Sequence, residues 1–184
     1  FTKPVERMRR TVAQVRALLR GDRVPLAVTT TARALKLNMP PTPTVPIYLA
    51  ALGDESVRLA GEVADGWLPF LFAPEKAHDV WGGALAAGGA KRPEGLDPLE
   101  VVAGGMVSVG DDVKGMLDLA RPIVALYIGG MGARGKNFYN DYVKRMGYEA
   151  AAAKIQDAYL DGRRNEAIAA VPDTRSGRRC DMPL

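Results

Sequence analysis

The sequence predicts an α/β fold with a parallel sheet. Two short apolar segments, 45–51 and 67–68, flank a helical pattern at 54–64. A strand–helix–strand order of this kind implies parallel strands joined by a right-handed crossover. A second helical pattern follows at 74–87, and then a third apolar segment at 99–109. Three strands make a thin sheet, too small to close into a barrel by itself.

The chain begins with an amphipathic helix over residues 5–19. Its apolar residues recur at spacings of three and four, which places them on one face: Val5, Met8, Val12, Val15 and Leu19. Gly21 follows at the position expected of a C-cap. The connector at 22–45 becomes rich in proline toward its end, and proline disfavours a helix there.

Capping and turn residues bound the next elements. Asp54 is predicted to be the N-cap of the first crossover helix, and Asp65–Gly66 the turn before the second strand. Pro74 suits the first position of the next helix. We expect that helix to end within the glycine-rich stretch Gly82–Gly95.

The remainder of the chain is predicted to be almost entirely helical. A helix is expected from Asp111 or Asp112 to about residue 120, and Pro122 interrupts or restarts it. Gly147 and Gly162 are expected to be C-caps. Three further helices are predicted: Asn137–Met146, Glu149–Leu160 and Asn165–Ala170.

The composition is that of an ordinary globular protein, with 47% apolar residues and a net charge of +4 over 184 residues. Residues 1–23 carry seven basic and two acidic side chains. No aromatic side chain lies between the basic ones, so we favour a solvated helix face over a nucleic-acid arm. There is no run of 18 apolar residues, and we expect no membrane partner. The single cysteine favours a reducing, cytoplasmic location.

One glycine-rich segment matches a phosphate-binding pattern. Gly130–Lys136 fits G-x-x-x-x-G-K, but the next residue is Asn137 where that loop needs Ser or Thr to ligate magnesium. A connection between two helices is therefore favoured, and a nucleotide hydrolase is the weaker alternative. His78 is the only histidine and Cys180 the only cysteine, so no metal site is expected.

The carboxyl ends of the predicted strands are the expected place for a ligand, as in other α/β sheets. These ends are Ala51–Gly53 and Trp67–Phe70. Small residues allow a ligand to approach the backbone, and the two aromatic side chains offer flat apolar surface to a planar ring. A sharp turn with core aromatics explains the same residues equally well, so both interpretations stand.

One resemblance joins segments from the whole chain: Phe1–Arg7, Pro46–Gly53, Arg58–Pro69, Ala125–Asn140 and Lys154–Arg163. Together they resemble the luciferase-like monooxygenase family, and in particular its actinobacterial branch of deazaflavin (coenzyme F-420) dependent oxidoreductases. The resemblance implies a TIM (β/α)8 barrel about twice this length, of which this chain is the C-terminal half. Ala125–Asn140 then belongs to an inserted helical region, which argues against the nucleotide loop.

The same resemblance implies a division of the chain. We expect residues 1–172 to form the half-barrel and residues 173–184, which depart from the family, to be a disordered tail. A first residue Phe1 in place of Met suggests that the chain starts within a longer protein. Because a half-barrel exposes sheet edges and apolar faces, we expect it to form a homo-oligomer.

The chemistry implied by the resemblance is hydride transfer between coenzyme F-420 and an unknown small organic substrate. The implied cofactor-binding residues are Ala51, Leu52, Gly53, Trp67, Arg134 and Lys136. The first four lie at strand ends, and the two cations would help to hold the cofactor's anionic tail or a substrate. No catalytic acid or base is assigned. The alternatives are a flavin-mononucleotide (FMN) dependent monooxygenase of the same superfamily and an inactive half-barrel fragment.

Overall fold

A computed structural model of the protein describes residues 3–25, 33–104, 109, 115 and 118–172. The chain divides into two compact units, the first formed by residues 1–70 and 81–104 and the second by residues 71–80 and 105–184. The predicted tail, 173–184, lies outside the described residues. None of the described helices combines the length and the apolar character needed to cross a membrane.

The first unit begins with the predicted amphipathic helix, α1 (Pro4–Leu19). Gly21 follows with φ of 88°, a left-handed conformation that favours glycine and confirms the expected C-cap region. Two basic side chains of α1 have acidic partners in the same unit: Arg9 pairs with Glu62, and Arg16 pairs with Asp65 at 3.0 Å. Part of the N-terminal basic cluster therefore fastens α1 to the unit.

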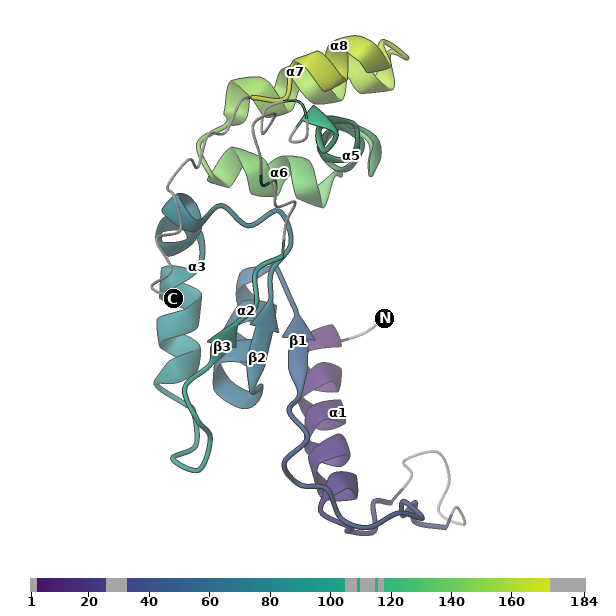
Figure 1. Ribbon diagram of the computed structural model, residues 1–184, viewed down its shortest axis with the longest axis vertical. Coiled ribbons are helices and arrows are strands. Elements are labelled where there is room, and N and C mark those ends of the chain that lie inside the picture. The colour runs from purple at the N-terminus through teal and green to yellow at the C-terminus, as the bar shows by residue number, and fades with distance from the viewer. Residues whose placement is uncertain (1–2, 26–32, 105–108, 110–114, 116–117, 173–184) are drawn as a thin grey trace. The chain divides into compact units, whose positions relative to one another are not determined.

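The sheet of this unit is parallel, with strand order β1 (Tyr48–Ala50), β2 (Gly66–Leu68) and β3 (Glu100–Val101). Helix α2 (Asp54–Val63) connects β1 to β2, and α3 (Pro74–Gly89) lies between β2 and β3 in the chain. Figure 1 shows the three strands side by side. The predicted strand–helix–strand unit is confirmed.

One row of the sheet links its three strands through side chains. Tyr48, Gly66 and Glu100 occupy matching positions on β1, β2 and β3. A Cβ on Gly66 would lie 2.0 Å from Cε1 of Tyr48, so any larger residue at position 66 would displace the tyrosine ring. The Tyr48 hydroxyl donates a hydrogen bond to the Glu100 carboxylate, which raises the pKa of Tyr48. Gly66 thus permits a side-chain link from β1 across β2 to β3.

Two predicted boundaries in this unit are wrong, and one is confirmed. The Val57 amide donates to the carbonyl of Gly53, so Gly53 is the N-cap of α2 and Asp54 is already helical. Helix α3 ends at Gly89, within the stretch Gly82–Gly95 as predicted, and Gly88 in its last turn packs directly against the backbone of α2. The third strand is two residues long, in place of the predicted 99–109, and residues 105–108 lie outside the description.

The second unit is helical, as predicted. It contains α5 (Arg121–Ala125), the π-helical turn η1 (Leu126–Gly130), α6 (Phe138–Arg145), α7 (Glu149–Leu160) and α8 (Arg164–Ala169). Gly147 and Gly162, which follow α6 and α7, have φ of 88° and 79°, as expected of C-cap glycines. The helix predicted from residue 111 falls largely outside the described residues.

Candidate functional site

The turn after β1 is fixed by two buried tryptophans. The indole Nε1 of Trp67 donates to the Ala51 carbonyl at 2.7 Å, and Nε1 of Trp81 donates to the Leu52 carbonyl at 3.0 Å. The two rings meet edge to face with centroids 5.0 Å apart. A buried indole N–H needs an acceptor, and here both acceptors belong to the predicted ligand-binding turn. The backbone of this turn is therefore held in one conformation.

Gly53 provides open space at the end of this turn. A Cβ built on Gly53 meets no atom within 4 Å. Its backbone is extended, with φ of −74° and ψ of 144°, a conformation open to any residue. The glycine is thus not required by strain or by a neighbour, and the space beside it is available to a ligand.

The two predicted aromatic surfaces differ in exposure. Trp67 is 1% exposed and belongs to the core, whereas Phe70 is 41% exposed. Trp67 therefore takes part in the site by holding the carbonyl of Ala51, and its ring is covered by Trp81. Sequence reasoning missed Trp81, although a tryptophan on a helix that follows a strand needs an acceptor for its N–H.

The two predicted cations belong to the second unit. Arg134 is exposed and binds two carboxylates of the α7 region, Asp157 at 2.8 Å and Asp161 at 3.2 Å. These hydrogen bonds raise the pKa of Arg134, and its charge is largely balanced by them. Lys136 is also exposed, and its backbone amide donates to the Ala133 carbonyl.

The glycine-rich segment before Lys136 is a connection between helices, as favoured from the sequence. Added Cβ atoms on Gly129 and Gly130 would lie 2.5 and 2.4 Å from the Tyr159 side chain, so these glycines let η1 pack against α7. A Cβ on Gly132 would lie 2.4 Å from the Lys136 carbonyl. These contacts give Gly129, Gly130 and Gly132 a packing role, which favours the helix connection over a phosphate loop.

Asn137, which replaces the Ser or Thr of a phosphate loop, has a structural role. Its side-chain oxygen accepts from the amides of Tyr139 and Asn140, which caps α6. Its Nδ2 donates to the carbonyls of Tyr127 and Ile128 in η1, at 3.1 and 2.9 Å. Asn140 donates to the same Ile128 carbonyl at 3.1 Å. The two buried amides thereby satisfy backbone groups that the wide π-helical turn leaves without their usual partners.

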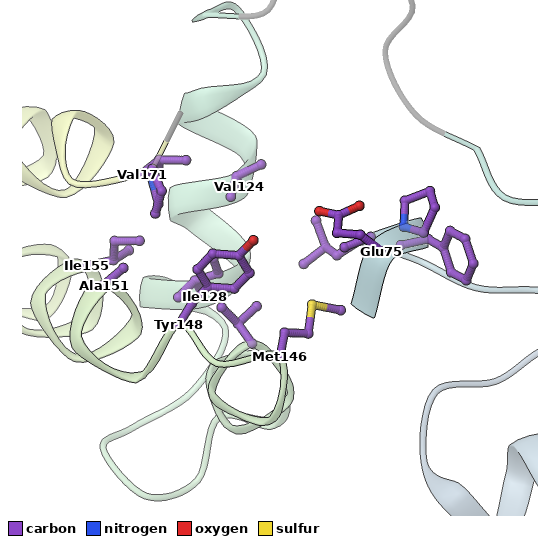
Figure 2. A pocket seen from close by; sticks show the side chains of 14 residues that line it. Glu75, Val124, Ile128, Met146, Tyr148, Ala151, Ile155 and Val171 are labelled. Atoms are coloured by element: carbon purple, nitrogen blue, oxygen red, sulfur yellow. The ribbon is translucent and has the colours of Figure 1, made fainter. Parts of the chain in front are cut away.

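A cavity of about 220 Å³ lies within the second unit. Its walls are the segment Leu71–Glu75 and apolar side chains from the helices, among them Val124, Ile128, Met146, Ala151 and Ile155 (Figure 2). Sequence reasoning did not find this cavity, because its walls come from segments far apart in the chain.

The backbone at the edge of the cavity is strained and held in place. Leu71 has φ of 51°, a left-handed conformation that is uncommon for a leucine. The buried Tyr142 hydroxyl donates to the Leu71 carbonyl at 3.0 Å. Burial raises the pKa of Tyr142, so the hydroxyl keeps its proton and remains a donor. The hydrogen bond stabilises an otherwise unfavourable turn.

No group of three or more His, Cys, Asp or Glu side chains within the described ranges is arranged to hold a metal ion. The candidate site of the first unit is made of the backbone of Ala51–Gly53 and the indoles of Trp67 and Trp81, and Arg134 and Lys136 belong to the second unit.

Comparisons with known proteins find relatives over nearly the whole chain. The sequence model described as luciferase-like monooxygenase matches residues 1–180. A Mycobacterium tuberculosis protein named as a coenzyme F-420-dependent oxidoreductase is 33% identical over 190 residues, which cover 94% of this chain and 54% of that protein. The 5,10-methylenetetrahydromethanopterin reductase of Archaeoglobus fulgidus is 33% identical over 131 residues, covering 71% of this chain and 39% of the reductase.

A solved structure gives the same fold. The coenzyme F-420-dependent tetrahydromethanopterin reductase of Methanopyrus kandleri superposes with a TM-score of 0.69 and 22% identity, over 92% of this chain and 48% of that one. With the parallel sheet and its helical crossovers, this likeness confirms the predicted fold class, an α/β structure that is part of a TIM barrel. The chain spans about half the length of the first of these relatives and of the solved structure.

Proposed function

Because the chain belongs to the luciferase-like monooxygenase family, we propose that it is part of an oxidoreductase that uses the deazaflavin coenzyme F-420. The reaction is hydride transfer between the coenzyme and a small organic substrate. The observation that carries this proposal is the 33% identity, over 94% of this chain, with a relative named for coenzyme F-420. The fold is compatible with it, since barrels of this class bind ligands at the carboxyl ends of their strands.

The turn after β1 fits the edge of a planar ring. The space beside Gly53 is open, Ala51 is small, and the indoles of Trp67 and Trp81 fix the carbonyls of Ala51 and Leu52. A ring can therefore approach this backbone without meeting a side chain at Gly53. In this proposal Ala51, Leu52 and Gly53 lie against the coenzyme, and the two tryptophans are positioning residues.

The chain's own contribution is binding and orientation. When bound, the deazaflavin supplies the hydride chemistry, and the protein supplies its placement. The hydrogen bonds from the two tryptophans fix the turn. Both rings are 1% exposed or less, so water does not reach the side of the turn that they cover. The proposal assigns no acid or base.

Of the two cations, Lys136 suits the coenzyme's anionic tail better than Arg134. Arg134 already binds Asp157 and Asp161, and an incoming anion would have to compete with both carboxylates. Lys136 is an exposed cation two residues along the same loop. In this proposal, Arg134 holds the loop to α7 and Lys136 meets the anion.

The test is a titration of the purified chain with oxidised coenzyme F-420 and, separately, with FMN, followed by absorbance and fluorescence. Gly53→Val places a branched side chain in the open space and is expected to weaken coenzyme F-420 binding tenfold or more. Gly95→Val is the matched control, because an added Cβ there also meets no atom within 4 Å, and Gly95 lies in an exposed turn that precedes β3 and does not follow the carboxyl end of a strand. The control is expected to bind like the unmodified chain.

Two results would overturn the proposal. Tighter binding of FMN than of coenzyme F-420 would favour a flavin-dependent monooxygenase. Binding of neither would favour a fragment that is inactive alone.

We also propose that the chain associates with itself in a reducing, cytoplasmic environment. The sheet carries exposed apolar side chains on β2, on β3 and directly after β3, with Leu68 at 38%, Val101 at 45% and Val102 at 40% exposure. Exposed apolar surface and sheet edges favour association. Light scattering coupled to size-exclusion chromatography should give at least twice the 19.7 kDa chain mass; a monomer at micromolar concentration would contradict this.

A further inference from the structure

The cavity of the second unit has the size of a small-molecule site. Its volume is about 220 Å³. An engineered cavity of about 150 Å³ lined by aliphatic and aromatic side chains binds benzene. The larger cavity here accommodates one ring with a short substituent.

The walls of the cavity are apolar, with two polar exceptions. Ile128, Met146 and Ile155 are buried side chains that contribute to its inner wall. Glu75, at the exposed start of α3, and the half-buried Tyr148 supply a carboxylate and a hydroxyl. In Figure 2, Glu75 lies across the cavity from Ala151 and Ile155. A few polar groups in an apolar pocket are the usual means of orienting a ligand.

The charge of Glu75 selects among possible ligands. A carboxylate accepts hydrogen bonds and repels anions. The cavity therefore favours a hydroxyl or amino group on the ligand and disfavours a carboxylate or phosphate near its opening. This preference defines the ligand as an apolar ring that carries a hydrogen-bond donor.

The backbone of Leu71, which forms one wall of the cavity, is fixed by a hydrogen bond within the second unit. Leu71 has a left-handed backbone, and the buried Tyr142 hydroxyl holds its carbonyl at 3.0 Å. Strained backbone conformations persist where the surroundings fix them, and they are concentrated at ligand-binding sites. The wall also begins three residues after β2, in the segment that follows the carboxyl end of a barrel strand, where ligand-binding loops of this fold occur.

We propose that this cavity binds the apolar ring of the organic substrate, with Glu75 accepting a hydrogen bond from the substrate's hydroxyl or amino group. The cavity as a ring-binding site stands on the geometry above. Naming its ligand as the substrate rests on the proposed oxidoreductase function.

The experiment uses benzyl alcohol as the probe and the whole chain without coenzyme. Methyl resonances of Met146 and Ile155 are followed by NMR in a ¹³C-labelled sample during the titration. We expect saturable shifts at both methyls. Sodium benzoate, which has the same ring and a negative charge, is expected to bind at least tenfold more weakly.

Variants on one helix separate cavity binding from surface binding. Ala151→Leu fills the cavity and is expected to weaken benzyl alcohol binding tenfold or more. Ala153→Leu makes the same change at an exposed position of α7 and is expected to have no effect. Glu75→Gln, an isosteric change at an exposed position in the first turn of α3, is expected to reduce the difference between benzyl alcohol and benzoate to less than threefold.

The outcomes distinguish the two proposals. Shifts that persist unchanged in Ala151→Leu, equal binding of benzoate, or no saturable binding would overturn the cavity inference. Coenzyme binding without binding of benzyl alcohol would overturn the cavity inference and leave the proposed oxidoreductase function intact. Ring binding in a chain that binds no coenzyme would support the cavity and overturn the proposed oxidoreductase.

Discussion

Replacing Gly88 by alanine should force α2 and α3 apart. An added Cβ at Gly88 would lie 2.2 Å from the carbonyl oxygen of Arg58 and 3.1 Å from the Cα of Gly61. Ordinary contact begins near 3.4 Å, so the helices must separate by about 1 Å. The atoms in the way are backbone atoms, and no side-chain rotation can relieve the overlap.

The expected cost follows from two opposing effects. Forcing a methyl group into a packed contact costs about 1–3 kcal/mol. Replacing glycine by alanine in a helix gains at most about 1 kcal/mol, and less here because Gly88 lies in the last turn of α3. We therefore expect Gly88→Ala to lower the free energy of unfolding by about 1–2 kcal/mol.

Gly83→Ala is the matched control on the same helix. An added Cβ at Gly83 meets no atom within 4 Å, so the helix-propensity gain is unopposed and should raise stability by about 1 kcal/mol. Urea unfolding followed by tryptophan fluorescence measures both variants, since Trp67 and Trp81 are buried in the same unit. Equal effects of the two substitutions, or a Gly88→Ala variant as stable as the unmodified chain, would refute the close crossing of α2 and α3.

Two further substitutions test single polar side chains. Asp65→Asn should cost about 1–2 kcal/mol at pH 7, because the carboxylate accepts from the Ile47 amide at 2.6 Å and from Arg16 at 3.0 Å. Burial acts to raise the pKa of Asp65, but these hydrogen bonds outweigh it and lower the pKa below 3.8. The stabilisation is therefore present above about pH 4 and is lost as the pH falls through the lowered pKa. The urea midpoints of the variant and the parent should converge in acid, and a difference in midpoint that does not change with pH would contradict this. Asn137→Ala removes both the α6 cap and the two donors to η1 and should cost about 2–3 kcal/mol. Asn137→Ser keeps a capping oxygen and should fall between Asn137→Ala and the parent in thermal unfolding; identical melting temperatures for the two variants would mean that the cap contributes nothing.

Local signals predicted the helical elements well. Helix α7 has the predicted bounds, and Gly147 and Gly162 have the left-handed backbone expected of C-cap glycines. These features depend on residues near one another in the chain, and a single sequence contains them. The third strand was predicted too long, because the length of a strand depends on the partner it pairs with.

The candidate site was predicted only in part. Strand ends are local, and the turn Ala51–Gly53 follows directly from the predicted strand. The side chains that fix this turn are not local, since Trp81 reaches the Leu52 carbonyl from a helix 29 residues away in the chain. The cavity behind Leu71 depends on Tyr142, whose hydroxyl acts over a separation of 71 residues. Contacts of this kind become visible only when the fold brings the segments together.

The glycines show that glycine content alone does not define the role of each glycine in this chain. The glycine-rich stretch Gly82–Gly95 contains the end of α3, as predicted, whereas the match of Gly130–Lys136 to a phosphate loop is not a ligand site. In the structure Gly88 is covered by the backbone of α2 and Gly130 by the ring of Tyr159, so both are packing positions. Gly53 has the opposite surroundings, with no atom near its missing side chain. What a glycine does is decided by the atoms opposite it. For that reason the proposed coenzyme site depends on Gly53 after a strand end, whereas Gly88 and Gly130 serve helix packing.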